Sequence, residues 1–212
     1  MKIDPATYFQ TLNAFKPIDN RLKDLKTYAL KHGVPIMDDE GMGFLRFLFS
    51  LLKPRRVLEI GTAIGYSAIG MALFDETVTI TTFERDEQMI NEARRNIERF
   101  GLNDRIHLIA SDAITFDTSR LQPGFDFLFI DAAKSQYRLF FEKYTPLLKD
   151  TGVVFIDNIL FHGLIFKNEI RNRHTKALMK KLRAFNRWLK DHPSYRTYFF
   201  PIGDGIALSV KK

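Results

Sequence analysis

The sequence predicts an α/β protein with a doubly wound, mostly parallel sheet. Short apolar runs alternate with helix-like segments from Val57 to about Leu148, an order typical of parallel strands joined by crossover helices. Several of these runs end at a glycine or an acidic residue, as strands do where they meet ligand-binding loops. Two further strand-like runs flank Gly203-Asp204-Gly205, a turn that favours a hairpin. We therefore expect a seven-stranded sheet with an antiparallel terminal strand.

Residues 1–54 are expected to form helices that cover this sheet. Asp4-Pro5 can begin a first helix, which Pro17 interrupts. Asp19 can cap a second helix that ends near His32-Gly33. A third helix ends at Pro54 and carries an apolar face made of Phe44, Leu45, Leu48, Leu51 and Leu52.

Residues 55–212 are expected to form the core of one domain spanning 1–212. A chain of 212 residues that is 45% hydrophobic can bury one full core without being divided. The predicted strands are 57–60, 79–84, 105–110, 127–131, 152–157, 196–200 and 206–210. The predicted helices are 67–73, 87–100 and 137–148, with a longer helical stretch after Asp157.

Two of the predicted strands end at acidic residues that we expect to meet. One run ends at Asp131, and the next ends at Asp157 with Asn158 directly after it. Because neighbouring strands lie about 4.8 Å apart, these three side chains should converge on one small, exposed volume. Carboxylate and amide oxygens suit Mg²⁺. Capping of the following loops is the alternative role for either Asp alone.

The segment VLEIGTAIGYS, residues 57–67, predicts a ligand-binding turn. Gly61 can adopt a positive φ and lets a ligand approach the backbone. The spacing of Gly61 and Gly65 is not the G-x-G-x-x-G of dinucleotide sites, which disfavours a pyrophosphate-binding turn and a nicotinamide dehydrogenase.

Two later strand ends offer groups that could bind a nucleoside. Glu84 ends the second predicted strand, where an acid can accept hydrogen bonds from both hydroxyls of a ribose. Asp112 and the backbone of Ala113 follow the third, where they could bind the edge of an adenine.

These motifs occur together in a known family. The chain resembles the Mg²⁺-dependent O-methyltransferases of the catechol and caffeoyl-CoA type, which use S-adenosylmethionine, and it is most similar to the bacterial branch that methylates 5-hydroxyuridine at the tRNA wobble position. The resemblance spans roughly Val34 to the C-terminus and rests on Glu59-Ile60-Gly61, Glu84, Asp112-Ala113, Asp131 with Lys134, and Asp157-Asn158. The branch assignment rests on PIMDDEG, residues 35–41, and EIGTAIGYSAI, residues 59–69.

The resemblance implies a Rossmann-like class I methyltransferase fold, a homodimer and a set of site residues. Lys134 and Asp131 would be catalytic, with Lys134 as base or electrostatic partner. The implied metal ligands are Asp131, Asp157 and Asn158. The implied cofactor-binding residues are Met37, Glu59, Gly61, Ser67, Glu84, Asp112, Ala113 and Asp131. Phe161, His162 and Phe166 are candidates for the substrate mouth or for packing.

Composition excludes several other classes of protein. The sequence has no cysteine, which rules out disulfides, thiolate metal sites and thiol nucleophiles. No run approaches the roughly twenty apolar residues of a membrane span, and the first residues are too polar for a signal peptide. We therefore expect a cytoplasmic protein that does not contact membranes.

The net charge of +7 bears on the substrate. Between Phe166 and Lys190 nine basic residues face only Glu169, and apolar residues recur there at helical spacing. The charges therefore form the outer face of an amphipathic helix, either a solvated surface or a contact for phosphates. The candidate tRNA contacts are Lys176, Lys180, Arg183 and Arg187.

The sequence thus predicts an S-adenosylmethionine- and Mg²⁺-dependent O-methyltransferase acting on 5-hydroxyuridine in tRNA, giving 5-methoxyuridine. The alternative within enzymes is a small-molecule methyltransferase of the catechol or caffeoyl-CoA type. The alternative from another class is a basic RNA-binding module with a degenerate cofactor site.

Overall fold

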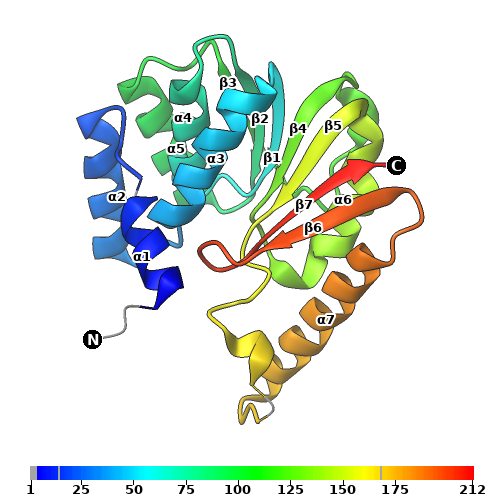
Figure 1. The fold of residues 1–212 in the computed structure, drawn as a ribbon. Helices are drawn as coiled ribbons and strands as arrows, with labels where there is room; N and C mark the ends of the chain where they lie inside the picture. The colour runs from blue at the N-terminus through cyan, green and yellow to red at the C-terminus, as the bar shows by residue number, and fades with distance from the viewer. Residues whose placement is uncertain (1–3, 14, 168) are drawn as a thin grey trace.

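The computed structural model of the chain describes residues 4–13, 15–167 and 169–212. In this part of the chain, seven strands form one sheet in the order β3-β2-β1-β4-β5-β7-β6 (Figure 1). The first five of these pair in parallel, and β7 runs antiparallel to both β5 and β6. The strands are β1 (Arg56–Ile60), β2 (Thr79–Glu84), β3 (Ile106–Ala110), β4 (Phe125–Ile130), β5 (Leu148–Ile156), β6 (Tyr195–Phe200) and β7 (Ile206–Lys211).

The strand order reverses beside β1. The chain runs outward from β1 through β2 to β3 and then returns to place β4 on the other side of β1. Such a switch point opens a crevice at the carboxyl ends of the strands, where α/β proteins bind ligands. The predicted fold class, including the C-terminal hairpin with its antiparallel strand, is confirmed.

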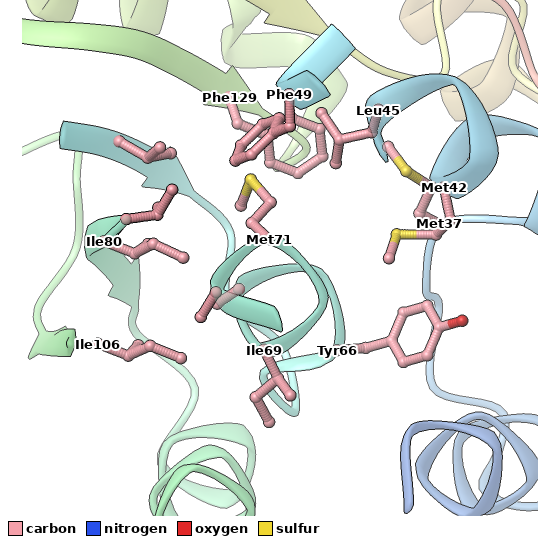
Figure 2. Close-up of a cluster of buried hydrophobic side chains, with 14 of the residues drawn as sticks. Met37, Met42, Leu45, Phe49, Tyr66, Ile69, Met71, Ile80, Ile106 and Phe129 are labelled. Atoms are coloured by element: carbon pink, nitrogen blue, oxygen red, sulfur yellow. The ribbon is translucent and has the colours of Figure 1, made fainter. Parts of the chain in front are cut away.

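Helices cover both faces of the sheet, so the sheet is doubly wound (Figure 1). Alternate strand residues supply the two cores, since Phe127 and Phe129 pack on one side and Leu128 and Ile130 on the other. Figure 2 shows the first core, where Met71 of α4 lies near Phe49 of α3. The first face carries α2 (Asn20–His32), α3 (Asp39–Leu52), α4 (Tyr66–Phe74) and α5 (Glu87–Arg99), and the second carries α6 (Tyr137–Tyr144) and α7 (Arg173–Lys190).

The N-terminal helices begin where the capping residues predict. In α1 (Pro5–Leu12) the Asp4 carboxylate accepts a hydrogen bond from the Thr7 amide. Asp19 caps α2 by accepting from the Arg21 amide at 2.8 Å, and Gly33 ends that helix with φ of 65°. Asp38 caps α3 through the Gly41 amide at 2.7 Å. A free helix N-terminus has unpaired amides, and these carboxylates satisfy some of them.

Two sequence predictions about the later helices are wrong. The helix expected over 137–148 ends at Tyr144, because Pro146 cannot continue an α-helix; a 3₁₀ turn at Thr145–Leu147 follows, and Leu148 begins β5. The helical stretch expected after Asp157 is delayed to Arg173, with an irregular segment and a short 3₁₀ turn, Leu164–Phe166, before it. None of the helices in the described ranges combines the length and apolar character of a membrane span.

Candidate cofactor and metal site

A cavity of about 560 Å³ lies at the carboxyl ends of the parallel strands. Eight of the residues predicted from the sequence line its wall: Gly61, Ser67, Glu84, Asp112, Ala113, Asp131, Lys134 and Asn158. These residues follow five different strands, so the sheet itself brings them together. The predicted site residues Met37, Glu59 and Asp157 lie outside the wall.

Gly61 ends β1 at the floor of the cavity. Its φ is 104°, and a Cβ atom at this position would collide with the backbone carbonyl oxygen of Asp131. The Asp131 amide in turn donates to the Ile60 carbonyl at 3.1 Å. Only glycine therefore allows the ends of β1 and β4 to approach this closely, so the positive φ predicted for Gly61 is confirmed, while the approach of a ligand to its backbone stays a prediction.

The Glu84 carboxylate is held by three backbone amides. Its Oε2 accepts from the Ala63 amide at 2.8 Å, and its Oε1 accepts from the amides of Arg85 and Asp86 at 2.8 and 2.9 Å. These bonds fix the carboxylate at the cavity wall and use three of its roughly four lone-pair sites, so Oε2, which accepts only one of them, is the oxygen free to accept from a ligand. The geometry suits recognition of a ligand hydroxyl.

Asp112 is ordered in the same manner on the next strand. The hydrogen bond from the Ile114 amide lowers the pKa of Asp112, and the Arg85 guanidinium at 3.0 Å acts in the same direction against partial burial. The neighbouring Ala113 carbonyl accepts from the Tyr144 hydroxyl at 2.7 Å. The 112–114 loop thus presents a charged acceptor and a fixed backbone to the cavity.

Glu59 lies beneath the cavity. Its side chain is fully buried and accepts hydrogen bonds of 2.5 Å from the hydroxyls of Ser67 and Thr82. Burial raises the pKa of Glu59 to about 7 against the opposing effect of these two bonds. The direct cofactor contact predicted for Glu59 stays a prediction. What the structure shows is that Glu59 orients Ser67, which does line the cavity.

Met37 is also set back from the cavity. It is 3% exposed and lies close to Met42, with Tyr66 below it (Figure 2). Its neighbours Pro35 and Ile36 line the wall in its place. These two residues and Tyr66 line the cavity without having been predicted, although Tyr66 directly follows Gly65 in the predicted ligand-binding turn, residues 57–67.

We expect Glu59→Gln to change how stability depends on pH. The unfolded carboxyl loses its proton near pH 4.5, whereas folded Glu59 keeps it to about pH 7. The folded state therefore binds the extra proton between these values, and the stability of the wild type should fall as pH rises through this window, by about 3 kcal/mol. Glutamine cannot ionise and should remove this loss.

Urea unfolding of both proteins at pH 5, 6, 7 and 8 measures the difference. The gap between the variant and the wild type should widen from pH 5 to pH 7 and level off by pH 8. A gap that stays constant across the series would show that Glu59 does not titrate as its burial requires.

Asp131, Asp157 and Asn158 meet at the ends of β4 and β5. The last residues of these strands, Ile130 and Ile156, are direct partners in the parallel ladder. Asn158 has φ of 55°, and its amide donates to Asp157 Oδ1 at 2.7 Å. The convergence expected from the sequence is therefore present in the structure.

Lys134 bridges two of these three residues. Its Nζ donates to Asn158 Oδ1 at 2.7 Å and lies 3.6 Å from Asp131 Oδ1. The ammonium group thus sits where oxygen donors converge, which shows that the arrangement attracts a cation.

The chemistry of this donor set fits Mg²⁺. Burial raises the pKa of Asp157 well above its ordinary value, and the nearby Asp131 charge adds to the shift. Burial likewise raises the pKa of Asp131, against the opposing effect of Lys134. A buried carboxylate beside a second, partly buried one is costly without a compensating cation. No group of three acidic or histidine side chains assembles in the described residues, so a metal here would rely on two carboxylates and one amide, as is typical of Mg²⁺.

The expectation of an exposed metal site is wrong for Asp157, which is only 3% exposed and whose backbone carbonyl accepts from the Tyr137 hydroxyl at 2.9 Å. Asp131 and Asn158, in contrast, line the open cavity. Phe161 and His162 line the mouth of the cavity, whereas Phe166 does not and is 72% exposed.

The basic face predicted between Phe166 and Lys190 lies on α7. The exposed residues Lys176, Lys180 and Arg187 have no acidic residue on their own helix. Arg183 is also exposed, but its guanidinium donates to the carbonyls of Ile165 and Lys167 at 2.6 to 2.8 Å. Arg183 therefore has a structural task that the sequence did not indicate.

Comparisons with known proteins agree with this architecture. A model of the O-methyltransferase family matches residues 16–212. A caffeoyl-CoA O-methyltransferase from Populus kitakamiensis is 31% identical over 95% of this chain and 90% of its own length. A catechol O-methyltransferase from Niastella koreensis is 27% identical over 93% and 98%.

Solved structures show the same fold. An O-methyltransferase from Bacillus cereus in complex with SAH has a TM-score of 0.77 and 28% identity, covering 92% of each chain. A structure from Staphylococcus aureus has a TM-score of 0.86 and 36% identity, covering 90% of this chain and 92% of that one.

Proposed function

Since the chain belongs to the O-methyltransferase family, we propose that it transfers a methyl group from S-adenosylmethionine to a hydroxyl oxygen of a small aromatic acceptor of the catechol or caffeoyl type. One observation carries the proposal. A single cavity joins the Glu84 carboxylate after β2 to Asp131, Lys134 and Asn158 on the other side of β1. The first suits the ribose of the methyl donor, and the second suits the hydroxyl that accepts the methyl group.

The residues of the chain have distinct tasks in this reaction. Glu84 would bind the ribose, and the 112–114 loop would bind the adenine edge. Asp131, Asp157 and Asn158 would hold Mg²⁺, which when bound supplies Lewis-acid activation and alignment of the acceptor hydroxyl. Mg²⁺ fits this donor set better than softer metals, because every donor is an oxygen.

Lys134 is placed to handle the proton of the acceptor. A neutral hydroxyl is a poor nucleophile towards a sulfonium methyl group, so its proton must leave or be shared. The Lys134 side chain, beside Asn158 and Asp131, can accept that proton when it is a neutral amine and so become an ammonium; if it is already an ammonium, it can only stabilise the developing oxyanion. The reaction combines an anion with a cation, and the apolar wall residues Ile36, Phe140 and Phe161 exclude water that would oppose it.

An acceptor assay tests the proposal. Purified protein would be incubated with methyl-labelled S-adenosylmethionine and, separately, a catechol, a caffeoyl thioester and bulk tRNA. Label transferred to the catechol or the thioester supports a small-molecule enzyme. Failure to bind S-adenosylmethionine at all would contradict the proposal and favour the basic RNA-binding module.

The basic face of α7 favours a second candidate function. An exposed run of cations on a helix that itself contains no acidic residue suits a polyanion, and the sequence resemblance points to 5-hydroxyuridine in tRNA. The phosphates of an acyl-CoA would use the same charges. The relatives named above support the small-molecule function more directly, so tRNA is the second candidate.

Charge reversal on α7 tests the tRNA candidate. Suppose that Lys176, Lys180 and Arg187 contact tRNA phosphates. Changing all three to Glu should then reduce the slope of log affinity against log salt concentration by roughly 0.7 to 0.9 for each lost contact. The apparent KM for tRNA should rise, and S-adenosylmethionine affinity should not change. Arg183 is left in place because it holds the preceding loop.

Filter binding across a salt series measures the slope. The matched control changes Lys23, Lys31 and Arg94 to Glu, which alters the net charge equally on the exposed surfaces of α2 and α5. Equal slopes in the α7 variant and the control would show that the α7 face is a solvated surface.

The homodimer implied by the family resemblance remains part of the proposal. Exposed apolar residues would supply its contact surface, including Phe47 and Leu51 on α3 and Tyr8 and Phe9 on α1. Exposed apolar residues that lie close together often mark contacts between proteins.

A further inference from the structure

The segment that follows β5 holds an unfavourable backbone conformation. Asn158, Phe161 and His162 have φ of 55°, 48° and 53°, values in the left-handed region that side chains with a Cβ atom rarely adopt. This segment carries one proposed metal ligand and two residues of the cavity mouth. Such a conformation persists only where surrounding contacts enforce it.

The turn between β6 and β7 supplies those contacts. The backbone carbonyls of Gly205 and Asp204 accept hydrogen bonds of 3.0 Å from the amides of Ile159 and Leu160. The Asp204 carboxylate accepts from the His162 amide at 2.5 Å. Three hydrogen bonds thus join the turn to Ile159, Leu160 and His162, which follow Asn158.

Both glycines of the turn are required for its close approach. Gly203 and Gly205 have φ of 54° and 81°. A Cβ atom on Gly205 would collide with the side chain of Leu160, and one on Gly203 would lie 2.5 Å from the Asp38 carboxylate at the start of α3. The turn therefore fills the space between residues 158–162, which follow β5, and the N-terminus of α3.

The second oxygen of Asp204 is also set toward this loop. Oδ2 is buried, has no hydrogen-bond partner among the described residues, and lies 3.7 Å from His162 Nδ1. A buried carboxylate with one uncompensated oxygen is costly for folding alone. The position of Asp204 is explained if the conformation that it imposes on residues 158–162 is needed by the metal site.

We propose that Asp204 is a positioning residue that holds residues 158–162 so that Asn158 is presented to the metal site. This inference rests on the proposed function for the role of Asn158. Asp204 itself does not line the cavity. It acts through the His162 amide and the main chain of the turn.

Asp204→Ala and Asp204→Asn test this role. Alanine removes the acceptor for the His162 amide, whereas asparagine keeps an oxygen at that place. Residues that orient metal ligands typically change metal affinity by 10- to 100-fold. We therefore expect Asp204→Ala to weaken Mn²⁺ binding by at least about tenfold, and Asp204→Asn to stay within about threefold of the wild type.

Mn²⁺ binding is measured by electron paramagnetic resonance, and amide hydrogen exchange is followed at Leu160 and His162. Exchange at both amides should rise in Asp204→Ala, while S-adenosylmethionine affinity should be unchanged. The control is Asp150→Ala, near the start of β5, whose carboxylate is 97% exposed and pairs with Lys211 of β7. If Asp204→Ala does not fold, Gly205→Ala, which forces Leu160 away, should show the same pattern.

The outcomes separate this inference from the proposed function. Wild-type metal affinity and wild-type exchange in Asp204→Ala would overturn the positioning role. Absence of Mn²⁺ binding by the wild type would contradict the metal assignment, and the exchange measurement would still test whether Asp204 holds the loop.

Discussion

Replacing Asp157 by asparagine should lower the rate of methyl transfer by about a thousandfold or more without unfolding the protein. Lewis-acid activation by a bound metal is worth several kcal/mol, and about 4 kcal/mol corresponds to a factor of a thousand. Asparagine keeps the oxygen that accepts from the Asn158 amide and removes only the charge. Since burial and the Asp131 charge both disfavour ionised Asp157, its removal should not reduce stability.

Chelation provides an independent check of the same site. Excess EDTA should stop turnover of the wild type, and added Mg²⁺ should restore it. Asp150→Asn, at a carboxylate that is 97% exposed, should behave as the wild type in both assays. Full activity in EDTA, or an Asp157→Asn variant as active as the wild type, would remove the metal from the proposed mechanism.

Glu84→Ala should weaken S-adenosylmethionine binding by at least about tenfold. A charge-assisted hydrogen bond from a ribose hydroxyl to Glu84 is worth roughly 1.5 to 3 kcal/mol, and about 1.4 kcal/mol corresponds to a factor of ten in affinity. The carboxylate is already fixed by the amides of Ala63, Arg85 and Asp86, so little ordering is needed when the ribose binds.

The control for this variant must disturb the same loop without touching the cavity. Asp86 caps α5 by accepting from the Met89 amide at 3.0 Å and does not line the cavity wall. Asp86→Ala should cost about 1 kcal/mol of stability and leave cofactor affinity intact. Calorimetry that finds equal affinity for Glu84→Ala and the wild type would place the ribose elsewhere.

Local signals in the sequence predicted most of the fold. Asp19 and Gly33 begin and end α2 through contacts within a few residues, and such contacts are encoded by the local sequence. The alternation of strands and helices predicted the parallel sheet, and with it the meeting of Asp131 and Asp157 at neighbouring strand ends. The helix expected to reach Leu148 ends at Tyr144 because Pro146 stops it, and this proline is itself a signal in the local sequence.

The sequence by itself determined the order of the strands' polar ends, because each lies at the boundary of an apolar run and the sheet gathers such boundaries at one edge. Tertiary structure alone decided which residues face the cavity. Glu59 and Glu84 follow similar apolar runs, yet one is buried against Ser67 and Thr82 and the other lines the wall. Depth depends on packing between elements, which spacing along the chain does not specify. For the same reason, the hold of Asp204 on residues more than forty positions earlier became visible only once the hairpin turn lay against residues 158–162.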